Sequence, residues 1–241
     1  SRSLFGTTAG FISGHLARFG IEISFVSQTD IGQWRSAVRP NTKMFFLETP
    51  SNPLGEAADI EAIAKIAHEN GALLAVDTCF CSPAVQQPLR FGADLSVQSG
   101  TKSIDGQGRV LGGIVCGSQE LVSQVAMYVN SAGLSISPFN AWLLLGGLET
   151  LMLRTDAQSA AALEIAQWLQ QQPQVAKVYY SGLPENPQAA LVKKQQRTGG
   201  TVIAFEVKGG TEAAWKVIDR VQIFSKTANF GDVRSPIAHP W

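Results

Sequence analysis

The sequence predicts an α/β fold built on a mostly parallel sheet with helices on both faces. Short apolar runs alternate with helical patterns along the chain, which favours βαβ units. The runs Ala72–Val76 and Leu95–Val97 are short and bounded by turn residues, as is typical of buried parallel strands. A chain of 241 residues that is 45% hydrophobic is long enough to bury a substantial core around such a sheet.

The first part of the chain supplies the elements of this sheet. The expected elements, in order, are a helix over 5–19, a strand over 21–26, a short helix over 30–38, a strand over 44–47, and a helix from 59 to Gly71. Asp30 and Asp59 stand directly before helical patterns, where a carboxylate caps the first free N–H groups. The apolar residues that follow Asp59 fall on one helix face, so this helix is predicted to pack on the sheet.

After Gly113 the pattern changes to a second α/β unit with fewer ligand-like residues. A strand over 114–116 and a helix over 119–129 precede a joint at 133–138, and two helices follow over 139–153 and 156–171. Further along, we expect strands over 175–180 and 201–207 and helices over 188–196 and 212–220. The prediction is a large domain over 1–136 and a smaller C-terminal domain over 137–241.

Composition excludes several classes of function. The formal net charge is +0, so the sequence gives no footprint for nucleic acid, and no apolar run is long enough to span a bilayer. The three cysteines form no CxxC pair and no zinc pattern, which fits a reduced cytoplasm. The three histidines are far apart in sequence, so no metal site is predicted.

Residues that can do chemistry gather where the apolar runs end. Asp77 follows one run, and Ser99, Thr101 and Lys102 follow the next. Ligands of open α/β sheets lie beyond the carboxyl ends of the strands, so we expect these groups to face one crevice. A lysine amine forms a Schiff base with an aldehyde, and a carboxylate keeps a pyridine nitrogen protonated. In an extended chain both hydroxyls would project to one side and donate to phosphate oxygens. The set therefore indicates pyridoxal phosphate (PLP) as cofactor.

Each of these residues also has an ordinary structural interpretation. Lys102 alone is typical of a solvated surface lysine, and Asp77 is compatible with a helix N-cap. Ser99 and Thr101 are compatible with backbone turns or caps. Asn52 precedes a proline in a common turn context.

Four segments carry a family resemblance, and they fall in the family's order. They are SRSLFGTT at 1–8, ETPSNPLGE at 48–56, VDTCFCSPAVQQPLRFGADLSVQSGTKSIDGQGRVLGG at 76–113, and TANFGDV at 227–233. Together they resemble the Cys/Met-metabolism family of PLP-dependent transsulfuration enzymes, in particular the branch that acts on O-succinylhomoserine. The resemblance implies the aspartate-aminotransferase fold, fold type I.

The resemblance also implies roles for seven residues. Lys102 would carry the cofactor and Asp77 would face the pyridine nitrogen. Ser99 and Thr101 would bind the phosphate, Asn52 would reach the ring hydroxyl, Phe5 would stack on the ring, and Asn229 would lie near the substrate carboxylate. Many members have tyrosine where this chain has Phe5, so stacking is kept but a phenol that moves protons is not.

The implied reaction is γ-replacement on O-succinylhomoserine or another O-acylhomoserine, with sulfide or cysteine as the sulfur donor and homocysteine as the product with sulfide. Cystathionine γ-synthase and γ-lyase reactions of the same family are alternatives. A truncated PLP-fold chain that only binds or associates is an alternative of a different class. We expect a homotetramer for the full-length protein. We also expect that further phosphate ligands precede Ser1, that the carboxylate-binding arginine follows Trp241, and that this chain alone is inactive.

Overall fold

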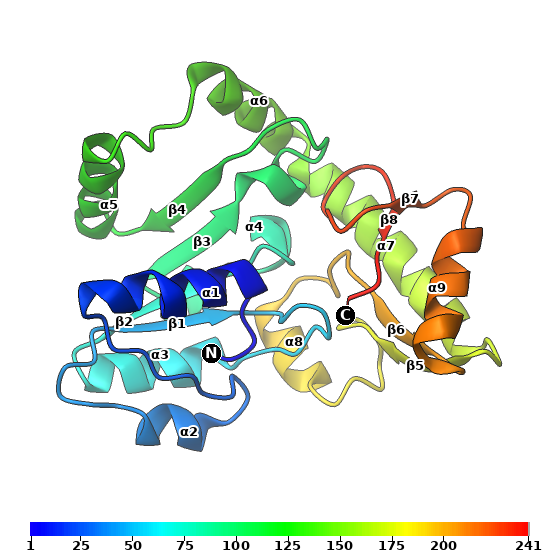
Figure 1. Ribbon diagram of the computed structural model, residues 1–241, viewed down its shortest axis with the longest axis horizontal. Coiled ribbons are helices and arrows are strands. Elements are labelled where there is room, and N and C mark those ends of the chain that lie inside the picture. The colour runs from blue at the N-terminus through cyan, green and yellow to red at the C-terminus, as the bar shows by residue number, and fades with distance from the viewer. Residues whose placement is uncertain (241) are drawn as a thin grey trace.

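The sheet predicted from the sequence is present. A computed structural model describes residues 1–240, and its main sheet has the order β1 (Met44–Glu48), β2 (Leu73–Asp77), β3 (Leu95–Ser99), β4 (Gly113–Gly117) (Figure 1). β1, β2 and β3 run parallel, and β4 is antiparallel to β3. The fold class, a mostly parallel α/β sheet, is confirmed.

Two capped helices accompany this sheet. Asp30 caps α2 (Ile31–Ser36) by accepting the N–H of Gln33 at 3.1 Å, and Asp59 caps α3 (Ile60–Glu69) by accepting the N–H of Ala62 at 3.0 Å. Both predicted caps are therefore confirmed. The apolar face of α3 packs with α2 and the strands in one core, whose largest fully buried members are Leu47, Ile60, Ile63, Ile66, Leu74 and Val76.

The N-terminal region differs from the prediction in two places. The expected helix over 5–19 is divided into α1 (Gly6–Gly14) and the short 3-10 helix η1 (Leu16–Phe19). The expected strand over 21–26 is wrong, because this segment belongs to no strand and β1 is the edge of the sheet. Val26 accepts a single backbone bond, from the N–H of Arg2 at 2.8 Å. An apolar extended run becomes a strand only where a neighbouring backbone completes its ladder.

The set of elements that link the later strands of the sheet to one another and lead into the second unit is helical. It comprises α4 (Ser82–Val85), the 3-10 helix η2 (Pro88–Phe91), the π-turn η3 (Gly100–Ile104), α5 (Gln119–Ser131), α6 (Pro138–Glu149) and α7 (Leu151–Gln170). The predicted helix over 139–153 ends early, because Thr150 has non-helical φ and ψ of −108° and 2°. α7 consequently starts five residues before the predicted position 156.

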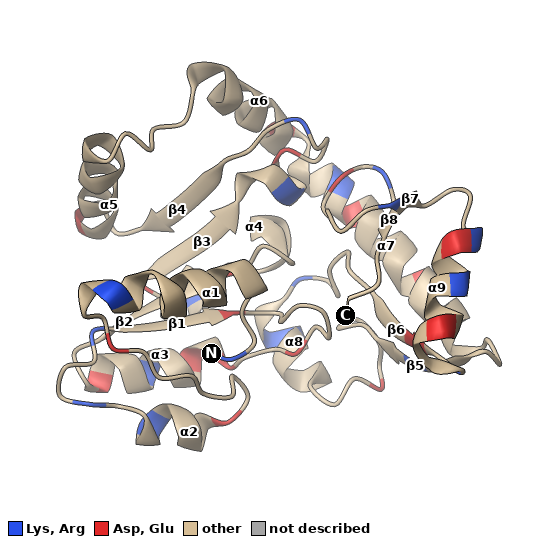
Figure 2. Ribbon diagram, viewed as in Figure 1, with Lys and Arg blue, Asp and Glu red and all other residues tan. Residues whose placement is uncertain are grey.

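The second unit is built on α7, the long helix that runs diagonally through Figure 1. Its remaining elements are β5 (Val175–Tyr179), α8 (Ala189–Gln195), β6 (Ala204–Val207), α9 (Gly210–Arg220), β7 (Ser225–Lys226) and β8 (Pro236–Ile237). β5 pairs antiparallel with β6, and β7 pairs in parallel with β8. Figure 2 shows basic and acidic residues interspersed along α9.

Two glutamines attach α8 to the backbone that precedes α3. The Gln195 amide accepts the N–H of Ile60 at 2.9 Å and donates to the carbonyl of Ala58 at 2.9 Å. The Gln188 amide makes the same pair of bonds with Ala57, at 2.8 Å and 2.6 Å. Each amide thus satisfies buried backbone groups, as a neighbouring strand would. The division at residue 136 stays a prediction, and these contacts join its two sides.

Within residues 1–240, no helix combines the length and the apolar character that crossing a membrane requires.

Candidate active site

Three parallel strands end in polar residues at one edge of the sheet. Glu48, Asp77 and Ser99 are the last residues of β1, β2 and β3. Glu48 and Asp77 are direct partners in the strand register. This edge is where open α/β folds bind their ligands.

Lys102 lies in η3, directly after β3. Its backbone departs from the helix, with φ −91° and ψ −131°. Its Nζ donates to Oδ1 of Asn229 at 2.5 Å and lies 4.6 Å from the ring centroid of Phe230. The structure thereby brings together two predicted site residues that are 127 positions apart. Burial lowers the pKa of the Lys102 amine, which favours the uncharged nucleophilic form.

Asp77 is a carboxyl group held at the edge of the core. Burial raises the pKa of Asp77, and its Oδ1 accepts the backbone N–H of Cys79 at 2.9 Å. The alternative that Asp77 is a helix N-cap is wrong, since Cys81 occupies the N-cap of α4. Among residues 1–240, no lysine or arginine forms an ion pair with Asp77.

Glu48 is a site residue that the sequence reasoning missed. Its side chain is buried, and Oε2 accepts the N–H of Phe5 at 2.6 Å. Burial, and then the nearby Asp77, raise the pKa of Glu48 to about 7. The bond fixes the start of α1, and with it Phe5, next to the end of β1. The available signal was that Glu48 ends an apolar run, as Asp77 does.

The two hydroxyl residues are arranged differently from the expectation. Ser99 ends β3, but η3 begins at Gly100, so the premise of an extended chain from Ser99 to Thr101 is wrong. Oγ1 of Thr101 accepts the N–H of Gly112 at 3.2 Å. The N–H of Ser99 donates to Sγ of Cys79 at 2.9 Å.

An open cavity of about 320 Å³ adjoins these groups. It is lined by Thr101, Gly108, Arg109, Val110, Leu111 and Asn229. Asn52 is not among the lining residues and is exposed in the turn that follows β1. In the part of the chain that the structure describes, its side chain makes no hydrogen bond to another predicted site residue.

The donor set fits an aldehyde-bearing pyridine. Asp77 is a largely buried carboxyl without a cationic partner in residues 1–240, and a protonated ring nitrogen supplies such a partner. Lys102 offers a partly desolvated amine at the same edge, and Ser99 and Thr101 offer hydroxyls beside it.

Comparison with known proteins agrees with this fit. The profile of the family described as "Cys/Met metabolism PLP-dependent enzyme" matches residues 1–241. The chain belongs to this family. The cofactor of the family is the one that the lysine, the carboxyl and the hydroxyls fit, and the match extends over both units of the fold.

Several individual members of the family are similar to this chain. An O-succinylhomoserine sulfhydrylase of Pseudomonas aeruginosa is 52% identical over 240 residues, which are 100% of this chain and 60% of that protein. An L-methionine gamma-lyase of Porphyromonas gingivalis is 38% identical over 99% of this chain and 61% of its own length. The crystal structure of cystathionine gamma-lyase from Lactobacillus plantarum complexed with L-serine superposes with a TM-score of 0.94 at 33% identity, covering 98% of this chain and 62% of that chain. The chain therefore spans about 60% of the length of these relatives.

The raised pKa of Glu48 predicts a pH-dependent stability. Because the folded pKa of about 7 lies above the ordinary value of 4.5, the folded state holds this proton more tightly than the unfolded state. The contribution of Glu48 to stability is therefore lost as pH rises through about 7. Glu48→Gln keeps an acceptor for Phe5 but cannot ionise. Relative to the parent, this variant should gain about 2 kcal/mol between about pH 5 and about pH 8.

Urea unfolding of the cofactor-free protein at both pH values measures this gain. Glu120→Gln, an exposed change in the first turn of α5, is the matched control. A difference between Glu48→Gln and the parent that does not change with pH would contradict the assignment.

Proposed function

We propose that the protein carrying this chain is a PLP-dependent transferase that catalyses γ-replacement on O-succinylhomoserine, or another O-acylhomoserine, with a sulfur nucleophile. The observation that carries the proposal is the Lys102 amine, which lies beyond the strand edge that ends in Asp77 and contacts Asn229. The identity of 52% to the O-succinylhomoserine sulfhydrylase of Pseudomonas aeruginosa supports this branch of the family. Because the reaction with sulfide gives homocysteine, we place the protein in methionine biosynthesis.

Bound PLP supplies an aldehyde and an electron-accepting ring. Lys102 would hold this group through its amine, the nucleophile at the edge of the sheet. Its lowered pKa would suit the amine to move protons at both the α and the β carbon of the substrate, accepting each one before returning it. Asp77, whose carboxyl group is largely buried, would pair with the ring nitrogen and favour its protonated form.

The remaining predicted site residues would bind the cofactor and orient the groups around it. Phe5 would stack on the ring, and Glu48 accepts the backbone N–H of Phe5. Ser99 and Thr101 would hold the phosphate, and Asn52 would bind the ring hydroxyl. Asn229 accepts a hydrogen bond from the Lys102 amine and would orient it. Its proposed second role is to lie near the substrate carboxylate.

A γ-elimination is the second candidate. It is favoured by the similarity to L-methionine gamma-lyase of Porphyromonas gingivalis at 38% identity and to the solved cystathionine gamma-lyase. The same lysine and carboxylate serve both reactions, which differ in whether a nucleophile adds before the product leaves. Cystathionine γ-synthesis is the corresponding replacement with cysteine.

Further proposals concern the whole protein. We propose a cofactor-binding domain over 1–136, a part of a smaller domain over 137–241, a homotetramer, and a cytoplasmic location.

A product assay separates the candidate reactions. The full-length protein, incubated with O-succinylhomoserine and sulfide, should form homocysteine and succinate. O-acetylhomoserine, and cysteine in place of sulfide, are the matched alternatives. Ammonia and a 2-oxo acid as the main products with sulfide present would favour the γ-lyase. Absence of any turnover, with PLP bound, would support the non-catalytic alternative.

The site of cofactor attachment is predicted to be Lys102. Borohydride reduction of the PLP-loaded protein, followed by peptide mapping, should find the pyridoxyl group on Lys102. Lys43 and Lys65 are internal controls, because they lie before β1 and on α3. A label on either of them would refute the assignment.

Asp77→Asn should bind PLP but lose turnover by at least about 100-fold, because an amide does not hold the ring nitrogen protonated. Asp219→Asn, an exposed change on α9, is the matched control. Steady-state kinetics at saturating PLP measures the effect. Parental kcat in Asp77→Asn would show that the carboxylate serves only the turn at Cys79.

A further inference from the structure

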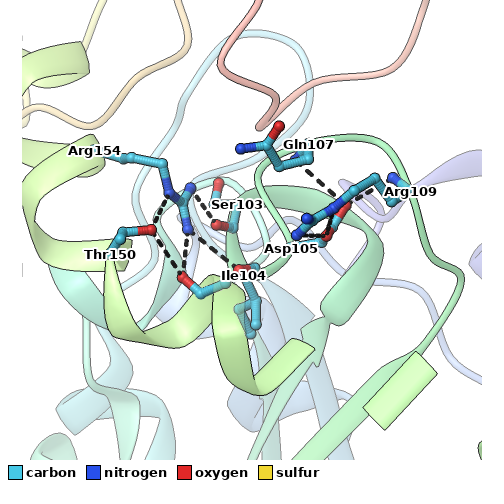
Figure 3. A network of polar contacts seen from close by, with 8 residues as sticks. Ser103, Ile104, Asp105, Gln107, Arg109, Thr150 and Arg154 are labelled. Atoms are coloured by element: carbon cyan, nitrogen blue, oxygen red, sulfur yellow. Dashed lines mark hydrogen bonds and ion pairs between the residues drawn. The ribbon is translucent and has the colours of Figure 1, made fainter. Parts of the chain in front are cut away.

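Arg154, near the start of α7, makes a group of hydrogen bonds beside the lysine. Its Nη1 donates to the carbonyl of Ser103 at 2.8 Å, and its Nη2 donates to the carbonyls of Ile104 at 3.2 Å and Gly147 at 2.7 Å. Its Nε donates to Oγ1 of Thr150 at 3.1 Å. Figure 3 shows the guanidinium between η3 and the end of α6.

The acceptors are the carbonyls of the two residues that follow Lys102. Ser103 and Ile104 are buried, and the turn η3 is irregular because Lys102 has non-helical dihedral angles. Buried carbonyl groups need a partner, and an irregular turn does not supply one for each. The planar guanidinium of Arg154 donates hydrogen bonds to both adjacent carbonyls at the same time.

Two glycines make room for the guanidinium and the turn. A Cβ on Gly106, which has a φ of +66°, would lie 2.1 Å from Nη1 of Arg154. A Cβ on Gly147 would lie 2.2 Å from the carbonyl oxygen of Ile104. The lysine turn and α6 therefore approach as closely as their backbones allow, with Arg154 joining them.

The chain beyond Gly106 is fixed separately. The Asp105 carboxylate accepts Nε and Nη2 of Arg109 at 3.0 Å and 2.8 Å, and it accepts the N–H groups of Gln107 and Arg109 (Figure 3). This closes the loop that follows the turn. Arg154 is thus the side chain that anchors residues 103 and 104 to the second unit.

The same face of α7 also holds the loop that contacts the lysine amine. Gln158, one turn after Arg154, donates to the carbonyl of Asp232 at 3.0 Å. The N–H of Val233 donates to the carbonyl of Gly106 at 2.9 Å. Residues 227–233 carry Asn229 and Phe230, which contact Nζ of Lys102. α7 therefore bonds both the backbone that carries the lysine and the loop that contacts its amine.

We propose that Arg154 is a positioning residue that sets the orientation of Lys102, by binding the carbonyls of Ser103 and Ile104 between the lysine turn and α7. This proposal rests on the proposed function in that Lys102 carries the cofactor. It does not depend on which substrate is used.

The test replaces the planar guanidinium of Arg154 but keeps its positive charge. In the full-length PLP-loaded protein, Arg154→Lys keeps a cation but cannot bond the carbonyls of both residues in one plane. We expect retention of PLP on Lys102, a shifted pH midpoint of the visible band of the lysine-bound cofactor, and a fall in kcat of about tenfold with KM less affected. Arg220→Lys, an exposed change at the end of α9, is the matched control and should change none of these.

The spectral titration separates positioning from simple stabilisation. A lower thermal midpoint with an unchanged pH titration of the visible band would overturn the proposal, as would parental behaviour in every measurement. If Arg154→Lys is insoluble, Thr150→Val removes only the acceptor of Nε, and the same spectral shift at smaller amplitude is expected. An unshifted band in Thr150→Val would then overturn the proposal. If borohydride reduction of the parent labels a lysine other than Lys102, the cofactor assignment is overturned as well. If Lys102 is labelled but the visible band of the variant is not shifted, this proposal alone is overturned.

Discussion

The parallel pairing of β1, β2 and β3 is the constraint on which the site depends. Parallel strands end at the same edge, so one register decides that Glu48 stands opposite Asp77 and that Ser99 ends the neighbouring strand. The buried apolar residues of these strands fix that register, because a shift by one residue would turn the apolar side chains away from the core. The free energy of packing the core therefore keeps these polar side chains together at the edge of the sheet, where solvation by water alone would not keep them.

Two largely buried carboxyl groups lie at this edge, and burial raises the pKa of both. For Glu48, burial has the larger effect and Asp77 adds to it. Such an arrangement destabilises the ligand-free fold, since buried charge without a partner is costly. It is favourable for a protein that binds a ligand with a protonated ring nitrogen.

Residues of the second unit contact the lysine of the candidate site. The loop over 227–233 places Asn229 and Phe230 on the Lys102 amine, and α7 bonds both this loop and the lysine turn. Gln188 and Gln195 attach α8 to the backbone before α3. The relative position of the two units therefore bears directly on the geometry of the lysine.

Local chemistry was readable from the sequence. The caps Asp30 and Asp59, the strands before Glu48, Asp77 and Ser99, and the place of Lys102 all follow from short-range patterns, and each lies where it was predicted. The lysine, the carboxylate and the hydroxyls already indicated the cofactor, the family resemblance implied the same one, and the family match confirms it.

Tertiary structure decided what depends on a distant partner. The run over 21–26 has strand-like residues but no neighbouring backbone to pair with, so it is not a strand. Thr101 lies in a π-turn rather than an extended chain, because Asp105 bonds back to the carbonyl of Gly100. The bond from Phe5 to Glu48 and those from Arg154 to the lysine turn link residues 43 to 51 positions apart. No periodicity encodes such contacts, since they exist only once the sheet register and the packing of α7 have brought the groups together.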